Sequence, residues 1–587
     1  MKKIFFAILI VLAISYSCTN SFLDTKPTGS ASFATLSTEA GVNAALIGAY
    51  HGLLGSNHTG GWFGDWTWSA SPSNWVWGSV ASDDGTKGSD IGDQSTIVPI
   101  ENYTVDGSNG YVSDKWNAGF DGIAKCNDVL KLIAATKSLT ADKVAVLKAQ
   151  ALFLRAWHHF ELRRVFNKIP YITELVDATK VKNDVEVWPM IETDLKFAVA
   201  NLPTTQADAG RPTKYSAEAV LARVYLFEKK YTEAAALCDD IINSGKYTLM
   251  ANFDDNYKIS TRNNKESIFE IQYVVNDGTP ESAEGGYGDA LNYPIDIDGT
   301  GTCCGFHQPT QNLVNAFKVD ANGLPLFDTF NNTNFTNDMG IASADKFVPD
   351  VTTPVDPRLD WTIGRRGVPY LDWGIMRGKD WVRDQNNAGP YLYKKNMFLK
   401  SEKGVYSTTT GWATGVNANN YRAYRLAHIL LWRAECAVQL GDLEKARTLV
   451  NQVRARAANP AHFVKGRCTT YNLPTGVAPV VDNTLTAANY QIGLYPSAGW
   501  TAAYALKAVQ WELRLEFAME GQRFFDLVRW GIAAQVLNDY IAKDKVFRSL
   551  LGGVKPAIFT AGHNEYWPIP QSQLELQKGI LTQTTGW

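Results

Sequence analysis

The sequence lacks an excess of charge of either sign. Its 587 residues include 56 Lys and Arg against 59 Asp and Glu, which leaves a net charge of −3. A protein that binds nucleic acid usually presents a strongly basic face to the phosphates. Nothing in this balance implies such a face, so we expect no nucleic-acid partner. The content of 45% hydrophobic and 20% charged residues is typical of a globular protein.

Long hydrophobic runs are missing after the N-terminus, where a membrane-spanning helix would need about 20 apolar residues. The segment MKKIFFAILIVLAISYSC instead carries two lysines, a short apolar stretch and a cysteine. This pattern predicts a signal peptide over residues 1–17. Cys18 then resembles the lipidated cysteine of bacterial lipoproteins, with cleavage at an incidental cysteine as the alternative. Several acyl chains on Cys18 would anchor the protein stably to a membrane.

Patterns of catalytic or metal-binding residues are also missing. The sequence contains no H-E-x-x-H, G-x-S-x-G or G-x-x-x-x-G-K-[ST] motif. Its seven cysteines and eight histidines show no zinc-site spacing. We therefore predict no catalytic residue and no metal site. A hydrolase with an unrecognised pair of carboxylates remains the enzyme alternative.

The acidic run SDDGTKGSDIGDQ, residues 82–94, is the best source of cation ligands. It lacks the alternating ligands and the terminal glutamate of an EF-hand loop. We interpret it as a turn-rich loop. No cofactor is predicted, and Ca²⁺ is an alternative that no clear motif supports.

The remaining cysteines are expected to be structural. Cys126, Cys238 and Cys436 lie in helical patterns and are predicted to be small buried side chains. The adjacent Cys303 and Cys304 could form a disulfide or stay reduced.

Helical patterns dominate what is present. Apolar residues recur at three- and four-residue spacings in the segments that begin at Asp114, Ala141 and Val187. Pro170 and Pro203 follow the second and third of these segments and end them.

Two further segments, 214–247 and 424–457, share the pattern of a helical hairpin. Their turns read KKYTEAA and GDLEKAR, and the Tyr231–Ala234 spacing returns as Leu443–Ala446. This is typical of tetratricopeptide-like units, which bury their apolar faces only by stacking on neighbours. We predict an all-α fold in which such hairpins form a scaffold, with long loop-rich insertions and a few short strands.

A long irregular segment separates the two hairpins. Residues 250–420 are rich in Gly, Asn, Asp, Pro and aromatics, with strand-like runs such as ESIFEIQYVV. Long irregular segments within compact proteins are usually functional. We predict one globular unit over residues 18–587, made of an N-terminal helical part (18–249), a ligand-face insertion (250–420) and a C-terminal helical part (421–587).

Aromatic residues gather in two irregular stretches. GWFGDWTWSASPSNWVWG, residues 61–78, holds five tryptophans, and residues 359–384 form a second cluster. A sugar ring has an apolar C–H face that stacks on an aromatic ring and a hydroxyl edge that binds Asn, Asp or Arg. The two clusters could converge on one face, although several tryptophans are expected to pack the loops themselves. The candidate glycan-binding residues are Asn74, Trp75, Trp77, Asp83, Trp361, Arg366, Tyr370 and Trp373.

EGQRFFDLVRWG carries charges at every third position, namely Glu520, Arg523, Asp526 and Arg529. Residues three apart are neighbours on a helix, so we interpret this segment as a structural ladder of ion pairs.

A series of further segments follows one order along the chain: WNAGFDGIAKCN, ALFLRAWHHFELRRVFNKIP, GRPTKYSAEAVLARVYL, CCGFHQPTQNLVNAF, DPRLDW, YRAYRLAHILLWRAEC, RLEFAMEGQRFFDLVRWG and YWPIPQSQL. Taken in this order, the segments resemble those of the SusD/RagB lipoproteins of Bacteroidetes nutrient-uptake systems. The resemblance covers nearly the whole mature chain.

The resemblance implies a non-enzymatic lipoprotein of the outer membrane, anchored through Cys18 and facing the cell exterior. It would bind an oligosaccharide or polysaccharide, or in some members peptides, and deliver it to a SusC-like TonB-dependent transporter. A competing hypothesis is a repeat scaffold whose aromatic residues mainly dock the transporter.

Overall fold

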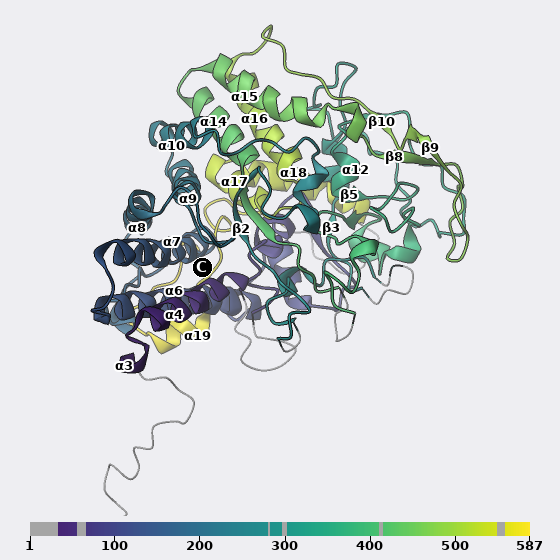
Figure 1. The fold of residues 1–587 in the computed structure, drawn as a ribbon. Coiled ribbons are helices and arrows are strands. Elements are labelled where there is room, and N and C mark those ends of the chain that lie inside the picture. Colours follow the sequence, from purple (N-terminus) through teal and green to yellow (C-terminus); the bar gives the residue numbers. More distant parts are fainter. Residues whose placement is uncertain are drawn as a thin grey trace, which may run out of the picture.

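The computed structural model describes residues 33–55, 66–279, 282–295, 297, 302–409, 415–548 and 558–587 (Figure 1). The predicted signal peptide and Cys18 lie outside the described residues. Two helices, α3 (Phe33–Leu36) and α4 (Glu39–His51), come first in the described part.

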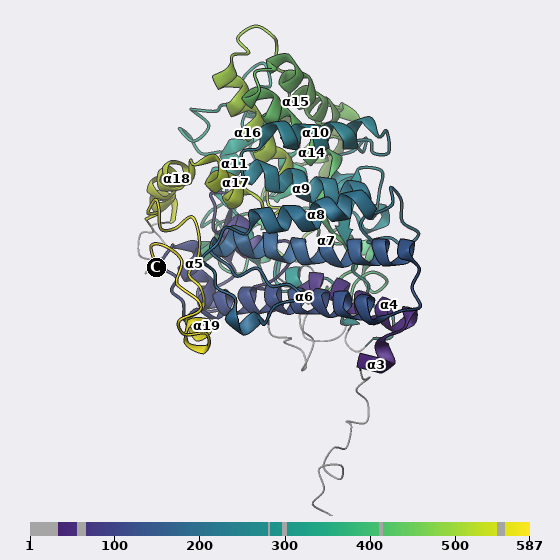
Figure 2. The ribbon, with the colours of Figure 1, turned by 90° about the vertical axis from the view of Figure 1, so that its left-hand side faces the viewer.

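Successive antiparallel helices form one side of the molecule. They are α6 (Gly110–Ala135), α7 (Ala141–Phe166), α8 (Trp188–Asn201), α9 (Lys214–Phe227) and α10 (Tyr231–Asn243). Each packs on the next, and Figure 2 shows them as stacked layers. The predicted helix-rich fold with helical hairpins is confirmed.

Polar side chains cap the starts of α6, α7 and α9. The Thr140 hydroxyl accepts a hydrogen bond from the Lys143 N–H, and Thr213 and Ser216 form a reciprocal capping box at α9. Such caps satisfy backbone N–H groups that have no partner within the helix. The hairpin boundaries are therefore encoded locally, which is why the sequence pattern predicts them well.

The second hairpin stacks directly on the first, despite the long segment between them. It consists of α14 (Leu426–Gln439) and α15 (Leu443–Ala457), and α14 packs on α10. Arg433 Nε donates to Asp239 Oδ2 at 2.9 Å across this contact. The helix α16 (Ala502–Phe517) extends the stack beyond α14 and α15.

The long segment between the two hairpins leaves the helix stack and returns to it through two paired strands. The strand β2 (Ser267–Ile271) pairs antiparallel with β7 (Tyr421–Arg425), so the strand predicted in ESIFEIQYVV is confirmed. The other paired strands are β1 (Gly85–Gly88) with β3 (Phe306–Pro309), β4 (Pro354–Val355) with β10 (Asn489–Tyr490), β5 (Ile363–Gly364) with β6 (Leu392–Tyr393), and β8 (Lys465–Cys468) with β9 (Val481–Thr486).

Several further helices, most of them short, complete the described part of the chain. They are α5 (Val98–Glu101), α11 (Gln311–Ala316), α12 (Leu359–Thr362), α13 (Gln385–Ala388), α17 (Arg523–Trp530), α18 (Ala533–Arg548) and α19 (Gln571–Leu576). A π-helical turn spans Trp75–Val80. No helix among the described residues has the length and apolarity needed to cross a membrane.

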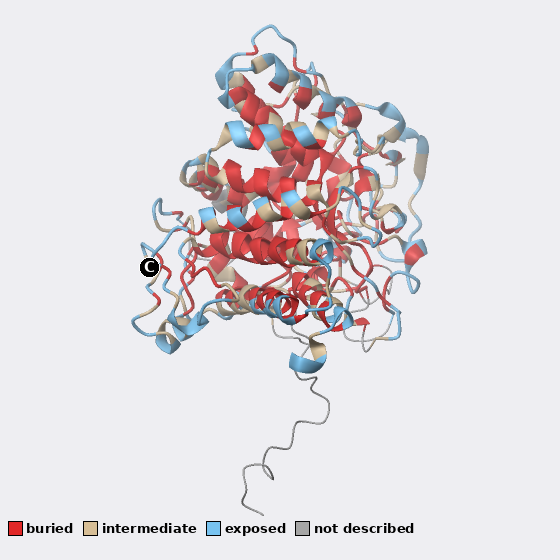
Figure 3. Cartoon of the chain, turned by 60° about the vertical axis from the view of Figure 1, so that its left-hand side comes forward, coloured by how far each residue is buried: buried red, intermediate tan, exposed pale blue. Residues whose placement is uncertain are grey.

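Buried side chains run through the middle of the helix stack and continue into the segment between the hairpins (Figure 3). Among the described residues, one large apolar cluster includes the core of the helix stack, and three smaller clusters accompany it. Cys126, Cys238 and Cys436 are buried free thiols, as predicted. The structure joins Cys303 and Cys304 through a disulfide.

Candidate functional site

Trp75 and Trp77 lie inside the protein core. Both are 0% exposed. The Trp75 indole N–H donates to the Gly288 carbonyl at 3.0 Å, and that of Trp77 donates to the Ser69 carbonyl at 2.6 Å. Their rings are covered by protein, and their only polar atoms are already bonded. The expectation that they form an exposed platform is therefore corrected: in this conformation they pack the segment they belong to.

Asn74 and Asp83 hold the same segment in place. The Asn74 amide donates to Glu161 at 2.9 Å and accepts from Lys115 at 2.8 Å. Asp83 forms ion pairs with Arg514 at 2.8 Å and Arg523 at 2.9 Å. Burial opposes ionisation of Asp83, but the two guanidinium groups hold its pKa at about 2. Both side chains are buried, so their role here is structural.

The other aspartates of residues 82–94 also form ion pairs with arginine. Asp84 pairs with Arg514 at 2.8 Å, while Asp90 and Asp93 both pair with Arg383 at 2.6 and 2.5 Å. Within the described residues, no group of three or more His, Cys, Asp or Glu side chains could hold a metal ion.

The second aromatic cluster is buried as well. Tyr370 and Trp373 are at most 2% exposed, and the Trp373 indole donates to the Phe398 carbonyl at 2.9 Å. The Arg366 guanidinium donates to the carbonyls of Ser343 at 3.0 Å and Asp345 at 2.6 Å. An anionic ligand would have to displace these bonds.

Trp361 differs from the other seven candidates because it is half-buried. Its indole donates to the His462 carbonyl at 2.9 Å, and its ring packs against a different apolar cluster from that of Trp373. The five aromatic candidates thus belong to three apolar clusters of the core and form no shared exposed face. Burying each large ring stabilises the fold by about 1.5–3 kcal/mol, which favours packing wherever an N–H partner is available.

The charges of EGQRFFDLVRWG form ion pairs, but mostly with other parts of the chain. Asp526 and Arg529 make the one i,i+3 pair, at 2.7 Å. Glu520 instead pairs with Lys395, and Arg523 pairs with Asp83. The prediction of a ladder along one helix is therefore wrong for most of these charges, which pair with distant residues instead. Glu520 lies before α17, which begins only at Arg523, and so is not part of that helix.

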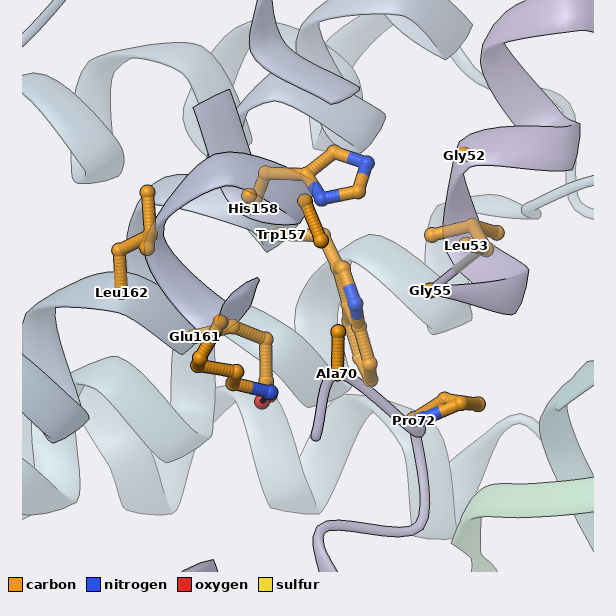
Figure 4. Close-up of a pocket in the computed structure, with 12 residues that line it drawn as sticks. Gly52, Leu53, Gly55, Ala70, Pro72, Trp157, His158, Glu161 and Leu162 are labelled. Carbon is orange, nitrogen blue, oxygen red and sulfur yellow. Dashed lines mark ion pairs between the residues drawn. The ribbon is translucent and has the colours of Figure 1, made fainter. Parts of the chain in front are cut away.

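A small cavity lies behind the first aromatic stretch, between η1 (Gly52–Leu54), α6 and α7 (Figure 4). Its volume is about 30 Å³, and Trp157, His158 and Glu161 lie along it. Burial lowers the pKa of His158 to about 4, so the imidazole is neutral. This volume accommodates about one water molecule and excludes a sugar ring.

A larger surface depression, which we name the aromatic groove, has a volume of about 350 Å³. It lies where α6, the residues after α7 and α19 meet, and Figure 2 shows α19 beside α6. It is lined by Trp66, Trp116, Asn117, Phe120, Ile123, Ala124, Pro170, Ile172, Ala178, Gln573 and Gln577. Volumes of this order are typical of small-ligand sites.

Apolar rings and amides share the lining of the aromatic groove. The Trp116 and Phe120 ring centroids are 4.7 Å apart, and Phe166 supports Trp116 edge-on at 5.2 Å. Gln573 Nε2 donates to Asn117 Oδ1 at 3.4 Å. Gln577 Oε1 is buried and accepts no hydrogen bond from the described residues. The groove offers stacking surface together with the amide side chains of Asn117, Gln573 and Gln577.

The sequence pattern does not reveal this groove. Trp116 and Phe120 fit the apolar stripe of a helix, which predicts core positions. Gln573 and Gln577 lie more than 400 positions later, and only the tertiary structure brings α19 to α6. Trp66 belongs to the first tryptophan stretch, but it was not among the eight candidates.

A second depression of about 270 Å³ has a different character. It is lined in part by Tyr50, Asp208, Arg211, Gln272 and Glu284. Arg211 Nε pairs with Asp208 at 2.8 Å, and Arg211 also donates to Gln150. Charged groups dominate its polar atoms.

Two protein-family models match this chain. The model of the SusD family matches residues 265–587, which is more than half of the chain. The chain belongs to the SusD family. A second family model, described as starch-binding and associating with the outer membrane, matches residues 21–226.

Relatives within the SusD family are distant in sequence. SusD-like protein P2 of Formosa agariphila is 28% identical over 291 residues, covering 47% of this chain and only 54% of that protein. The starch-binding protein SusD of Bacteroides thetaiotaomicron is 22% identical over 482 residues, covering 77% and 75%. Similarity to the first of these is thus confined to about half its length.

Solved structures show the same fold. Surface glycan-binding protein A of Bacteroides thetaiotaomicron, in complex with laminarihexaose, has a TM-score of 0.65 and 20% identity to this chain. The match covers 93% of this chain and 99% of that one. A laminarin-binding SusD-like protein has a TM-score of 0.62 and 23% identity, covering 94% and 100%.

Proposed function

We propose that this protein is a non-catalytic glycan-binding lipoprotein that captures oligosaccharides outside the cell. It hands them to a SusC-like TonB-dependent transporter for import. The observation that carries the proposal is membership of the SusD family, with a fold shared over nearly the whole chain with a protein bound to laminarihexaose. Peptides are the alternative cargo.

The placement of the acidic residues supports binding without hydrolysis. A glycosidase needs two carboxyl groups about 5–9.5 Å apart on either side of the scissile bond. The aromatic groove has no carboxylate in its described lining. Asp83, the one acid among the eight candidates, is buried between two arginines.

Outer-membrane anchoring through Cys18 belongs to the same proposal. The description of the second family model, association with the outer membrane, supports it. Cys18→Ser would release the protein from the membrane fraction, whereas Cys126→Ser, which changes a buried thiol, would leave it there.

Affinity gel electrophoresis tests glycan capture. The chain beginning after Cys18 is run through gels containing laminarin, starch or an acidic polysaccharide, and each polysaccharide is then assayed for released sugar. Retardation by a glycan without product release is expected. Release of oligosaccharides would establish a hydrolase, and free migration in every gel would overturn the proposal. Copurification with the transporter, measured separately, tests delivery.

A further inference from the structure

We propose that the aromatic groove is a subsite for an uncharged sugar ring. This inference rests on the proposed function and adds its location and the class of sugar. The groove shares none of its described lining with the eight residues predicted from the sequence.

The shape of the groove fits one or two pyranose rings. Its volume of about 350 Å³ is far above the 30 Å³ of the cavity behind the first aromatic stretch. Trp66 and Phe120 are both half-buried, so part of each side chain remains accessible. Tryptophan and phenylalanine have only two side-chain torsions and lose little entropy when a ligand stacks on them.

The polar atoms of the groove fit hydroxyl groups. Asn117, Gln573 and Gln577 each carry both donor and acceptor capacity in one amide. A buried oxygen without a hydrogen-bond partner destabilises the free protein. Gln577 Oε1 is such an atom, and rotation of the amide toward a bound sugar would let a hydroxyl donate to this oxygen and remove the destabilisation.

The aromatic groove and the second depression differ in the charge of their lining residues. The described lining of the aromatic groove contains no Asp, Glu, Lys, Arg or His. A uronate would therefore lose hydration there without gaining a cation. The depression around Arg211 and Glu284 has charged groups of both signs and lacks the cluster of rings.

The test is isothermal titration of the chain beginning after Cys18 with laminarihexaose, maltohexaose and an oligogalacturonide. Wild type should bind at least one neutral hexasaccharide more tightly than the acidic one. Gln577→Met removes the amide oxygen at similar length and breaks no hydrogen bond of its side-chain oxygen, so it should fold normally. We expect it to raise Kd about fivefold.

Phe120→Ala removes a stacking surface and should raise Kd about tenfold. Tyr471→Ala is the control, since Tyr471 is 37% exposed and comes soon after β8 in the chain, and Figure 1 shows β8 on the opposite side of the molecule from α19. Its Kd should equal that of wild type. Thermal unfolding of each variant distinguishes lost binding from lost structure.

Three results would overturn the inference. If wild type binds a neutral hexasaccharide and Gln577→Met and Phe120→Ala bind it equally well, the groove is not the site, although the proposed function stands. If wild type binds only the acidic oligosaccharide, the class of sugar is wrong. Binding of none of the three by wild type would count against the proposed function and this inference together.

Discussion

Arg425 and Glu516, 91 positions apart, form an ion pair at 2.6 Å in which both side chains are 0% exposed. Arg425 ends β7, where the chain returns from the long insertion, and Glu516 lies near the end of α16. Glu516 also pairs with Arg358 at 3.0 Å and accepts a hydrogen bond from Arg456. One carboxylate therefore ties three segments of the molecule together.

Replacing Glu516 by Gln should destabilise the fold strongly. Three buried guanidinium groups would each lose one of their carboxylate partners, and breaking a buried pair costs about 3–5 kcal/mol. The free energy of unfolding in urea measures this. Asp328→Asn is the control, because it removes an exposed pair with Lys507 and should cost at most about 1 kcal/mol. Equal effects in the two variants would contradict the role assigned to Glu516.

Asp289 should make stability depend on pH. Burial raises its pKa to about 6, while hydrogen bonds from Ser73 and Ser71 oppose the rise. Because the folded pKa lies above the ordinary value of 3.8, the favourable contribution is complete below about pH 4. It is lost as the pH rises through 6.

Asp289→Asn removes this titration and can still accept both serine hydrogen bonds. Relative to wild type, we expect it to gain about 3 kcal/mol of stability at pH 7 and nothing near pH 4. Thermal unfolding of both proteins from pH 4 to pH 7 measures the difference. A difference that stays constant across this range would show that Asp289 does not titrate there.

Gly78→Ala should disrupt the attachment of the π-helical turn to the start of α17. A Cβ at Gly78 would lie 1.8 Å from the Gly521 carbonyl oxygen, a backbone atom that cannot swing away. We expect a loss of about 1–3 kcal/mol or more from overpacking. Gly48→Ala lies inside α4 with no atom within 4 Å of the new Cβ. It should stabilise the protein by about 0.5–1 kcal/mol. If Gly78→Ala keeps the stability of wild type, the π-helical turn and Gly521, which precedes α17, are not in this close contact.

Trp75→Ala should destabilise the folded protein even in the absence of ligand. Its ring is fully buried, and truncation of such a side chain costs about 3–5 kcal/mol. Near-ultraviolet circular dichroism and the unfolding midpoint should both change. If Trp75→Ala keeps wild-type stability and loses glycan binding, Trp75 contacts the ligand in another conformation of this segment.

How well the sequence predicts each feature depends on how local its cause is. The starts of α7 and α9 follow from side-chain caps, and α7, α9 and α10 all follow the apolar spacing, so the prediction of these helices is confirmed. The strand in ESIFEIQYVV is also confirmed, although its partner β7 lies far along the chain. Whether an aromatic ring in a Gly-rich stretch is exposed depends on segments far away. Gly288 and Phe398 supply the acceptors that allow Trp75 and Trp373 to be buried.

By itself, the sequence determined the helical hairpins, the absence of familiar catalytic motifs and, through the order of its motifs, the family. The tertiary structure alone decided which tryptophans are core and which side chains meet at the aromatic groove. The physical reason is that helix periodicity and capping act over a few residues. Solvent exposure depends instead on which distant elements, such as α6 and α19, pack against each other.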